Sequence, residues 1–268
     1  MTAEAGVIGY QGEPGAFSEQ AAKELMPEAT TRGFVTFDAL ICAVAEGDIS
    51  YALLPIENSI YGAIARSYDL LWAHQNLHII DETSLQVVQN LIGVPGTTVD
   101  KIREVRSHPV ALEQCRTFLA QYPHWQRKVV DDTAGAVREI IEQGDQHIVA
   151  IASALAASVY NATVLSDGIQ DERENYTRFF LIARNTLPRR SLDRACIALA
   201  FPSHVGSLRD ALTVLANAGL NLRSITSRPS GEGVFQYRFY CEIENGDREK
   251  ISSVLKQIQG QNRILGCY

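Results

Sequence analysis

The sequence predicts an α/β protein with a long N-terminal region and a smaller C-terminal module. Three observations lead to this fold class. Strand-like and helix-like segments alternate over residues 1–185, a basic segment containing Pro188 interrupts the alternation, and residues 195–268 follow a different order of elements. The chain has 268 residues, of which 46% are hydrophobic and 21% charged, so it is long enough for two such units.

In the N-terminal region, each element follows from hydrophobic periodicity and from the turn residues around it. Short β-branched or apolar runs predict strands at residues 5–12, 51–58, 77–94, 127–130, 147–153 and 179–183. Apolar residues at helical spacing predict helices at residues 16–26, 37–47, 63–74, 108–122, 132–144 and 154–160. This alternation predicts layers with largely parallel sheets, which bind ligands beyond the carboxyl ends of their strands.

The C-terminal module is predicted to be a βαββαβ unit of the ferredoxin-like type. Its strands and helices are expected at residues 196–201, 206–219, 220–229, 235–244, 247–260 and 263–268. We therefore place the domains at residues 1–185 and 195–268, with a linker at residues 186–194.

Composition excludes several classes of function. The formal net charge of −7 argues against a nucleic-acid or anionic-membrane partner. The five cysteines are scattered and form no CxxC pair, which is typical of reduced cytosolic thiols. The N-terminal residues do not resemble a signal peptide, and no apolar run is long enough to span a bilayer. We expect a cytoplasmic protein.

Neutral hydrogen-bonding side chains recur at the predicted strand ends. Thr177 and Arg178 stand at the mouth of a buried strand, and Asn58 ends another. Ser107 and Gln114 are seven residues apart, close to two helical turns, so they are expected to face one pocket. These side chains would orient an anion and share a proton, and Arg178 is the nearby candidate cation.

Each of these motifs also has a purely structural interpretation. The loop from Tyr10 to Ser18 is either an anion site at a helix N-terminus or a tight turn between strand and helix. Glu57, Asn58 and Ser59 are equally compatible with a turn and a helix cap. Ser107 or His108 is expected to cap one helix, and Asp132 or Thr133 another.

Several familiar chemistries have no motif in this sequence. It lacks the GxSxG elbow, the HExxH motif, the Walker loop and the GxGxxG fingerprint. Cys115 has only His108 nearby as a potential base, so a thiol nucleophile is weakly supported. His, Cys and carboxylate residues are not clustered at metal-binding spacing. We expect no metal and no organic cofactor.

Five motifs in order resemble the prephenate dehydratase family, which includes enzymes that use arogenate. They are "YQGEPGAFSEQAA", "LLPIENSIYG", "SHPVALEQC", "DDTAGA" and "NYTRFFLI". The resemblance implies a catalytic region of two lobes, akin to type 2 periplasmic binding proteins, with the active site between them. It places lobe 1 at about residues 1–80 and 165–185, and lobe 2 at about residues 81–164.

The resemblance also implies the roles of site residues. The catalytic residues would be Thr177, Asn58, Ser107 and Gln114. The substrate-binding residues would be Arg178, Glu57, Ser59, Ser18 and Thr133. The reaction would remove the ring carboxylate of prephenate as carbon dioxide and its ring hydroxyl as water. A placed donor that helps the hydroxide leave is typically worth ~10²–10⁴-fold.

The C-terminal module resembles the ACT domain, which implies phenylalanine as effector and a homodimer or homotetramer. The effector residues would be Gly206, Ser207, Leu208, Ser227, Arg228 and Pro229. Two positions depart from the family pattern. Thr226 replaces a glutamate and Arg209 replaces an apolar residue, so we expect phenylalanine to bind and its inhibition to be weaker than usual.

Three questions stay open at this point. The sequence does not separate prephenate from arogenate as the substrate. A non-catalytic protein that keeps the two lobes and an amino-acid sensor is a second hypothesis, disfavoured by the intact Thr177 and Asn58 set. A hydrolase that uses Cys115 or a serine is a third.

Overall fold

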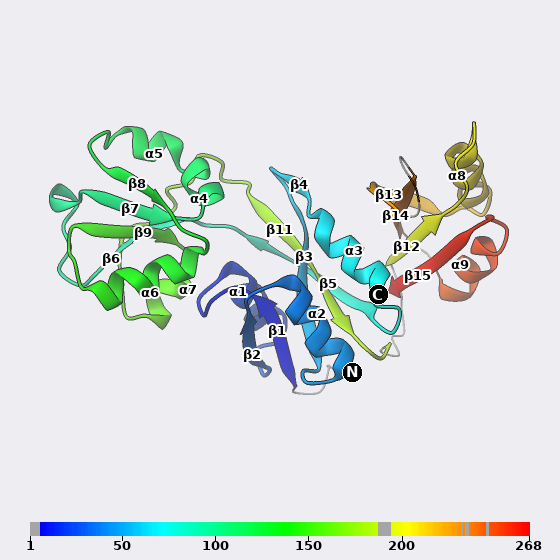
Figure 1. Cartoon of the computed structure of the whole chain (residues 1–268), viewed down its shortest axis with the longest axis horizontal. Helices are drawn as coiled ribbons and strands as arrows, with labels where there is room; N and C mark the ends of the chain where they lie inside the picture. Colours follow the sequence, from blue (N-terminus) through cyan, green and yellow to red (C-terminus); the bar gives the residue numbers. More distant parts are fainter. Residues whose placement is uncertain (1–5, 187–193, 232, 234–235, 245–246) are drawn as a thin grey trace.

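The structure, a computed structural model, describes residues 6–186, 194–231, 233, 236–244 and 247–268. Three parts follow one another along its long axis (Figure 1). Lobe 1 lies in the middle, lobe 2 at one end and the C-terminal module at the other. Most of the predicted linker, residues 187–193, lies outside the described residues.

Lobe 1 is built on a mixed sheet with the order β5-β11-β3-β1-β2. β1, β2 and β3 are parallel, and β11 is antiparallel to both β3 and β5. The strands are β1 Val7–Gln11, β2 Thr30–Phe34, β3 Tyr51–Asn58, β4 Gly62–Ala63, β5 His78–Gln86 and β11 Tyr176–Ala183. The helices are α1 Phe17–Leu25, α2 Phe37–Glu46 and α3 Ala65–Ala73.

Lobe 2 has a second mixed sheet with the order β10-β6-β9-β7-β8. β7 lies parallel to β8 and β9, whereas β6 is antiparallel to its neighbours β9 and β10. The strands are β6 Asn90–Gly93, β7 Glu104–Ser107, β8 Gln126–Val129, β9 Ile148–Ala152 and β10 Thr163–Ser166. The helices are η1 Val99–Lys101, α4 Pro109–Gln114, α5 Arg116–Ala120, α6 Thr133–Gln143 and α7 Ala154–Val159.

The chain passes between the two sheets twice, once between β5 and β6 and once between β10 and β11. Both crossings lead to or from the centre of the molecule (Figure 1). The predicted α/β class and its two lobes are therefore confirmed. The expectation of largely parallel sheets is wrong in part, because β11 and β6 run against their neighbours.

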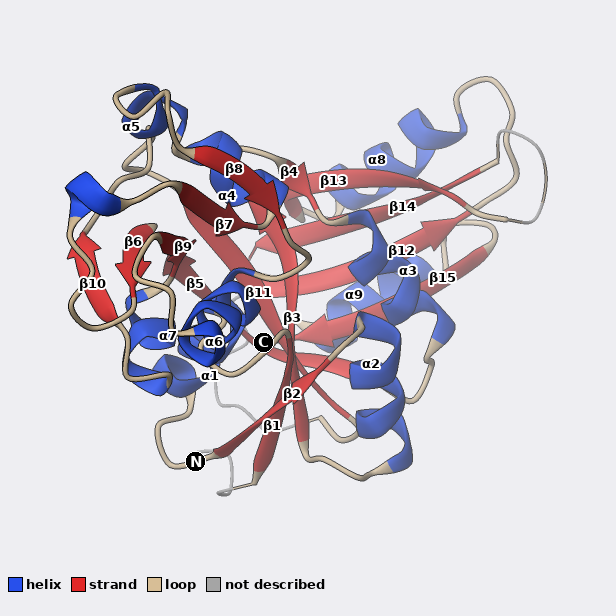
Figure 2. Ribbon diagram, turned by 60° about the vertical axis from the view of Figure 1, so that its left-hand side comes forward, coloured by secondary structure: helices blue, strands red, loops and turns tan. Residues whose placement is uncertain are grey.

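The C-terminal module has the predicted βαββαβ order and an antiparallel sheet, β13-β14-β12-β15. Its elements are β12 Arg194–Ala200, α8 Ser207–Asn217, β13 Asn221–Pro229, β14 Tyr237–Glu244, α9 Arg248–Leu255 and β15 Gln261–Cys267. β15 continues onto β5 in parallel, so one sheet runs through lobe 1 and this module (Figure 2).

Within this sheet, the strands of lobe 1 and those of the C-terminal module meet where Gly266 of β15 pairs with Ile79 of β5. A Cβ atom at residue 266 would lie 2.2 Å from the Ile79 carbonyl oxygen, so only glycine permits this approach. One buried core also spans the junction, since Cys196, Tyr240 and Tyr268 pack in the same cluster as Phe180 of β11. The module is thus packed against lobe 1 as part of one hydrophobic core.

Candidate active site

The pairing of β3 with β11 brings two predicted site residues together. The end of β3 lies beside the start of β11, and Thr177 lies opposite Asn58 in the register. β3 is fully buried up to Ile56, so its apolar part fixes where Asn58 emerges. The Asn58 Nδ2 amide donates a hydrogen bond of 3.1 Å to Thr177 Oγ1.

The orientation of the Asn58 amide is determined by its backbone contacts. Its Oδ1 atom accepts hydrogen bonds from the backbone N–H groups of Ile60 at 3.0 Å and Tyr61 at 3.1 Å. Because a backbone N–H only donates, this end of the amide must be the oxygen. The Nδ2 group therefore faces β11, where it also donates to Asn175 Oδ1 at 2.8 Å.

This orientation leaves the Thr177 proton available. Thr177 Oγ1 accepts from Asn58, and no residue in the described part of the chain accepts a hydrogen bond from it. A hydroxyl carries one donor and two acceptor positions. The half-buried Thr177 can therefore donate its proton to a ligand, as a group that assists a leaving hydroxide must.

Asn175 was not among the predicted site residues, although it lies in the same motif. It is fully buried, and its Nδ2 atom has no hydrogen-bond partner among the described residues. Asn175 and Gln114 both line a cavity of about 230 Å³. The buried Gln89 donates to Gln114 Oε1 at 2.9 Å, which leaves the Gln114 Nε2 donor for the cavity. Two amide donors thus meet at one cavity.

Ser107 is brought near but not onto this cavity lining. Its Oγ atom is fully buried and donates to the Ile151 carbonyl oxygen at 2.6 Å. The next residue, His108, caps α4 by accepting from the Val110 N–H through Nδ1. The predicted cap is confirmed. Of the predicted pair Ser107 and Gln114, only Gln114 lines the cavity.

Ser59 holds the backbone of the neighbouring segment. Its Oγ atom donates to the Glu174 carbonyl at 3.1 Å and accepts from the Tyr176 N–H at 2.9 Å. These contacts fix the approach to Thr177. Ser18 lies in the first turn of α1, and Thr133 is the first residue of α6, capped by Asp132. Their contact with a substrate stays a prediction.

A glycine loop of lobe 1 touches lobe 2. Gly15 has a φ of +93°, and a Cβ atom there would lie 2.5 Å from the Ala156 Cα atom of α7. The buried Ser153, the cap of α7, donates to the Gly15 carbonyl at 2.5 Å. The Tyr10–Ser18 segment is therefore a close contact between the lobes as well as a helix start.

Arg178 does not face this site. Adjacent residues of a strand point to opposite faces of the sheet, so Arg178 and Glu57 lie behind Thr177 and Asn58. The Arg178 guanidinium donates to Glu57 at 2.8 Å and to both oxygens of Glu242 at 2.6 Å. In this conformation Arg178 and Glu57 are engaged with each other and with Glu242, and substrate binding by them stays a prediction.

Electrostatics agree with this position of Arg178. Burial opposes the charge of the guanidinium, but the hydrogen bonds that it donates to Glu242 and Glu57, together with the negative charge of Glu242, outweigh this effect. The pKa of Arg178 is therefore raised above its ordinary value. A cation held so firmly by carboxylates is not free for an anionic ligand.

The structure gives little support to a thiol nucleophile or a metal site. Cys115 is fully buried, and burial raises its pKa to about 12, so the thiolate is not formed at neutral pH. Across the described ranges, no group of three or more His, Cys, Asp or Glu residues is placed to hold a metal ion. Nor does any described helix have the length and apolar character needed to cross a membrane.

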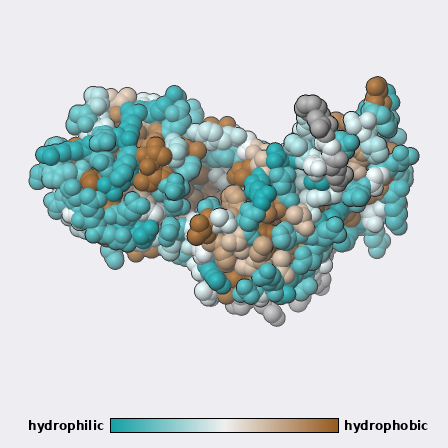
Figure 3. All heavy atoms as spheres, viewed as in Figure 1, coloured by the Kyte–Doolittle hydropathy of each residue, from teal (hydrophilic) through white to brown (hydrophobic). Residues whose placement is uncertain are grey.

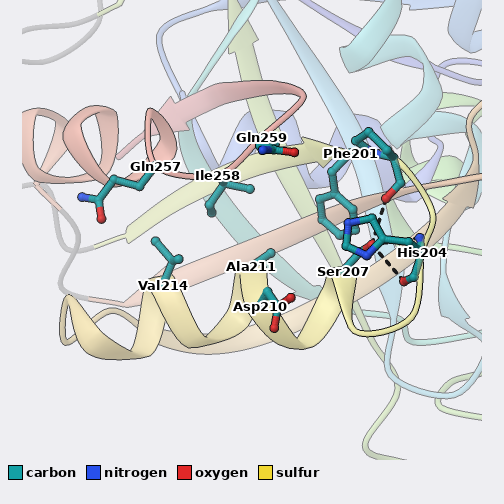
Figure 4. Close-up of a pocket in the computed structure, with 10 residues that line it drawn as sticks. Phe201, His204, Ser207, Asp210, Ala211, Val214, Gln257, Ile258 and Gln259 are labelled. Atoms are coloured by element: carbon teal, nitrogen blue, oxygen red, sulfur yellow. Dashed lines mark hydrogen bonds between the residues drawn. The ribbon is translucent and has the colours of Figure 1, made fainter.

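The predicted effector residues lie in two places of the C-terminal module. Ser207 lines a cavity of about 240 Å³ beside Phe201, His204 and Asp210 (Figure 4). Gly206 caps α8 with a φ of +92°, and Leu208 follows in the first turn. Ser227, Arg228 and Pro229 end β13, and Arg228 donates to Asp69 of α3 at 2.7 Å. Within this one chain, the second group does not line that cavity.

Fold and site together define a two-lobed α/β chain with a hydroxyl-amide site at the lobe junction and a ferredoxin-like module. The prephenate dehydratase family model matches residues 8–187, and the ACT domain model matches residues 202–260. The chain belongs to the prephenate dehydratase family and carries a C-terminal ACT domain.

Individual relatives agree with this assignment. The chain is 38% identical to "Arogenate dehydratase/prephenate dehydratase 1, chloroplastic" of Arabidopsis thaliana, over 97% of this chain and 71% of the relative. It resembles the prephenate dehydratase of Arthrobacter aurescens in complex with L-Phe, with a TM-score of 0.89, 27% identity, and 98% and 89% of the chains covered. It also resembles GqqA, described as a novel type of quorum quenching acylase, with a TM-score of 0.88, 32% identity, and 98% and 97% covered.

Proposed function

We propose that this protein converts prephenate to phenylpyruvate, carbon dioxide and water, as a prephenate dehydratase of phenylalanine biosynthesis. The observation that carries the proposal is the Thr177 hydroxyl, whose proton has no acceptor among the described residues and whose partner Asn58 also donates to Asn175, a residue of the cavity that Gln114 lines. Membership of the family supports it independently.

The geometry supports a specific division of labour. Thr177 donates a hydrogen bond to the ring hydroxyl as that group leaves, so that its developing negative charge is stabilised. The amides of Asn175 and Gln114 donate to substrate oxygens and hold the ring in place. Formation of the aromatic ring supplies the driving force, and Asn58 keeps the Thr177 lone pair occupied so that the proton points outward.

Arogenate is a second candidate substrate, and one observation favours it. The cavity rim carries Glu113, Asp171 and Glu172, against Arg116 as its cation. Prephenate is a dianion, whereas the ammonium group of arogenate reduces the net charge to one negative unit. An acidic rim repels the dianion more strongly, although exposed charges are partly screened by salt.

The test is a comparison of kcat/KM for the two substrates at equal pH and low salt. Wild-type protein is compared with Glu172→Gln as a charge-removing variant. If prephenate is the main substrate, the wild-type protein has a higher kcat/KM with prephenate than with arogenate. A preference for arogenate that falls in Glu172→Gln identifies the acidic rim as the cause. No turnover of either substrate would refute the proposed function.

An acylase activity like that named for GqqA lacks a comparable basis in the site. Acyl transfer by a serine or cysteine needs a base next to the nucleophile. In the site described here, the Ser107 hydroxyl donates to a backbone carbonyl and Cys115 is buried. Release of the acyl chain from an acylated amine by the purified protein, measured alongside the dehydratase assay, decides the point.

Regulation, assembly and location complete the proposal. We propose that phenylalanine binds between paired ACT domains and lowers turnover, with Gly206–Leu208 and Ser227–Pro229 as the effector residues. The chain would then act as a homodimer or homotetramer in the cytoplasm, without a metal or organic cofactor. The two separated motif positions within one chain support a site that needs a second copy. Sedimentation with and without phenylalanine would test the assembly.

A further inference from the structure

The Arg178 cluster joins the strand that carries Thr177 to the ACT domain. We define the cluster as Arg178 with Glu57 of β3, Glu82 of β5 and Glu242 of β14. Glu242 accepts from both terminal nitrogens of the guanidinium at 2.6 Å, in a bidentate fork. Glu57 accepts at 2.8 Å and Glu82 at 3.1 Å. One side chain of lobe 1 is thus held by three carboxylates, the most buried of which belongs to the ACT domain.

Burial makes this contact strong and sensitive to displacement. The side chains of Arg178, Glu82 and Glu242 are 11%, 12% and 4% exposed. Glu82 also pairs with Arg194 and Arg223 of the ACT domain. Counted among the described residues, these two arginines and Arg178 balance the three glutamates of the cluster. Removing one member of a buried charge network leaves its partners uncompensated, which is costly.

On its β3 side, the ladder of β11 is interrupted just after Arg178. Along the pairing with β3, the register shifts between Arg178 and Phe179, since Arg178 pairs with Glu57 and Phe179 with Pro55, and Ile56 is skipped. On the β5 side, residues Tyr176–Leu181 pair without a break, so the irregularity loosens β11 only toward β3. A bulge of this kind leaves the local strand less constrained by hydrogen bonds. Side-chain anchoring then has more influence on where Thr177 sits.

Apart from the Glu82 pairs, the other described side-chain hydrogen bonds and ion pairs of the ACT domain with lobe 1 lead to α3 and its end, whereas β11 also meets the ACT domain through the apolar packing of Phe180 against Tyr268. Arg228 pairs with Asp69 of α3, and Arg263 donates to carbonyl oxygens at the end of the same helix. The Arg238 guanidinium lies 3.8 Å from the centroid of Trp72, also on α3. These contacts hold the two parts together but lead to α3. Glu242 is the ACT residue that is hydrogen-bonded directly to the residue after Thr177.

We propose that Glu242 of the ACT domain is a positioning residue for catalysis, acting through Arg178 to set the place of Thr177. The ACT domain is then part of the structure that holds the active site, in addition to sensing an effector. A shift of β14 relative to β11 alters turnover first and substrate affinity little. The kinetic part of this inference rests on the proposed dehydratase activity, whereas the structural part does not.

The test uses full-length Glu242→Gln, which keeps the side-chain shape and removes the charge. Hydrogen exchange measured by mass spectrometry should become about 10-fold faster in peptides covering residues 174–180. With the better substrate, kcat should fall roughly 10- to 100-fold, with KM changed less than about twofold, because small displacements of a catalytic group have effects of this size. Glu242→Asp, which keeps the charge, should recover part of both losses and serves if the glutamine variant does not fold.

Asp69→Asn is the matched control, since it breaks another ion pair between the ACT domain and lobe 1. It should leave exchange at residues 174–180 and kcat close to the wild-type values. Unchanged exchange in folded Glu242→Gln would overturn the proposal, as would equal acceleration in Asp69→Asn. A rise in KM alone would overturn it in favour of substrate binding by Arg178. If the wild type turns over neither substrate, the proposed function fails, while the exchange data still decide the positioning role.

Discussion

Thr177 is the residue on which the proposed chemistry depends most. Because Asn58 occupies one lone pair of its hydroxyl, the proton is directed away from Asn58. Thr177→Ala removes the donor and should lower kcat by at least ~10²-fold in a steady-state assay, while circular dichroism stays unchanged. Thr177→Ser keeps the hydroxyl and should retain part of the activity. Near-normal turnover of the alanine variant would assign the donor role to another group.

Asn175 supplies the second prediction at this scale. Its buried Nδ2 donor has no described partner, which is expensive unless a ligand accepts the hydrogen bond. Asn175→Asp keeps the shape but replaces the donor by an oxygen that repels an anionic substrate. We expect KM to rise at least ~10-fold, the scale of one charge-assisted hydrogen bond. A folded variant with unchanged KM would show that Asn175 serves Asn58 alone.

At the residue scale, the sequence predicted some partners and not others. Asn58 at the end of β3 and Thr177 at the start of β11 meet because these two strands are antiparallel, whereas the largely parallel sheet expected from the sequence would place them at opposite edges. The sequence did not show which partners Arg178 has, since these partners include Glu242 of the ACT domain, which packs behind β11. Gln89 was missed because it lies in the crossing between the lobes, where no periodicity marks it.

At the scale of elements, the loop between β1 and α1 joins the lobes. Gly15 combines a φ of +93° with close packing against Ala156. Gly15→Ala should destabilise the protein by about 1–3 kcal/mol, from backbone strain and overpacking, and should also reduce turnover. Thermal unfolding checks the first effect. Gly144→Ala, in a left-handed position with open space around it, isolates the cost of strain.

The same loop predicts a dependence of stability on pH. Burial favours the neutral form of Glu19, but hydrogen bonds from the Gly15 N–H, Lys23 and Thr31 outweigh it and lower its pKa below 4.5. The contribution of Glu19 to stability is therefore complete above the ordinary value and is lost as the pH falls through the lower folded-state pKa. Glu19→Gln should lower the Tm at about pH 7, and its Tm should fall less than that of the wild type when the pH is lowered to about 3, below the ordinary pKa of a glutamate. An equal acid-induced loss in both would contradict this.

Elements were predicted well where their patterns were long and apolar. β3 has the predicted bounds, and α2 agrees with the predicted helix at residues 37–47, with Gly47 as its left-handed cap. β2 was missed because its residues are polar and mostly exposed at the edge of the sheet. β10 was missed for the same reason. The predicted helix at residues 108–122 is two helices, because the backbone leaves helical geometry at Cys115.

At the scale of the whole molecule, tan and brown residues are most frequent over the middle of the visible face, where lobe 1 lies, whereas both ends are mainly hydrophilic with smaller brown clusters (Figure 3). The relation of lobe 1 to the ACT domain was beyond the sequence. The single β5–β15 pair and the shared core depend on residues far apart in the chain, such as Ile79 and Gly266. The proposed domain boundaries at residues 185 and 195 remain a prediction, since the linker is largely outside the described residues.

Phenylalanine control is the prediction that belongs to this scale. Thr226 lacks the carboxylate that the family uses, and Arg228 is paired with Asp69 in this conformation. We expect phenylalanine to bind with measurable heat and to inhibit less strongly than is usual, because an effector acts only through its differential affinity for two states. Calorimetry and an inhibition curve on one preparation test both. If about millimolar phenylalanine gives no heat and no inhibition, the ACT domain has a structural role alone, since binding weaker than about 4 kcal/mol has no regulatory use at such concentrations.

The most direct test of the account is prephenate turnover by the purified wild-type protein after prolonged dialysis against a chelator. Phenylpyruvate is measured by its ultraviolet absorbance in alkali, and carbon dioxide is measured in parallel. We predict equal amounts of both products, at a rate that dialysis and added divalent ions do not change, because the site offers hydroxyl and amide donors for the reaction. No product, or activity that returns only with a divalent ion, would contradict the claim that Thr177 and its amide neighbours perform the dehydration.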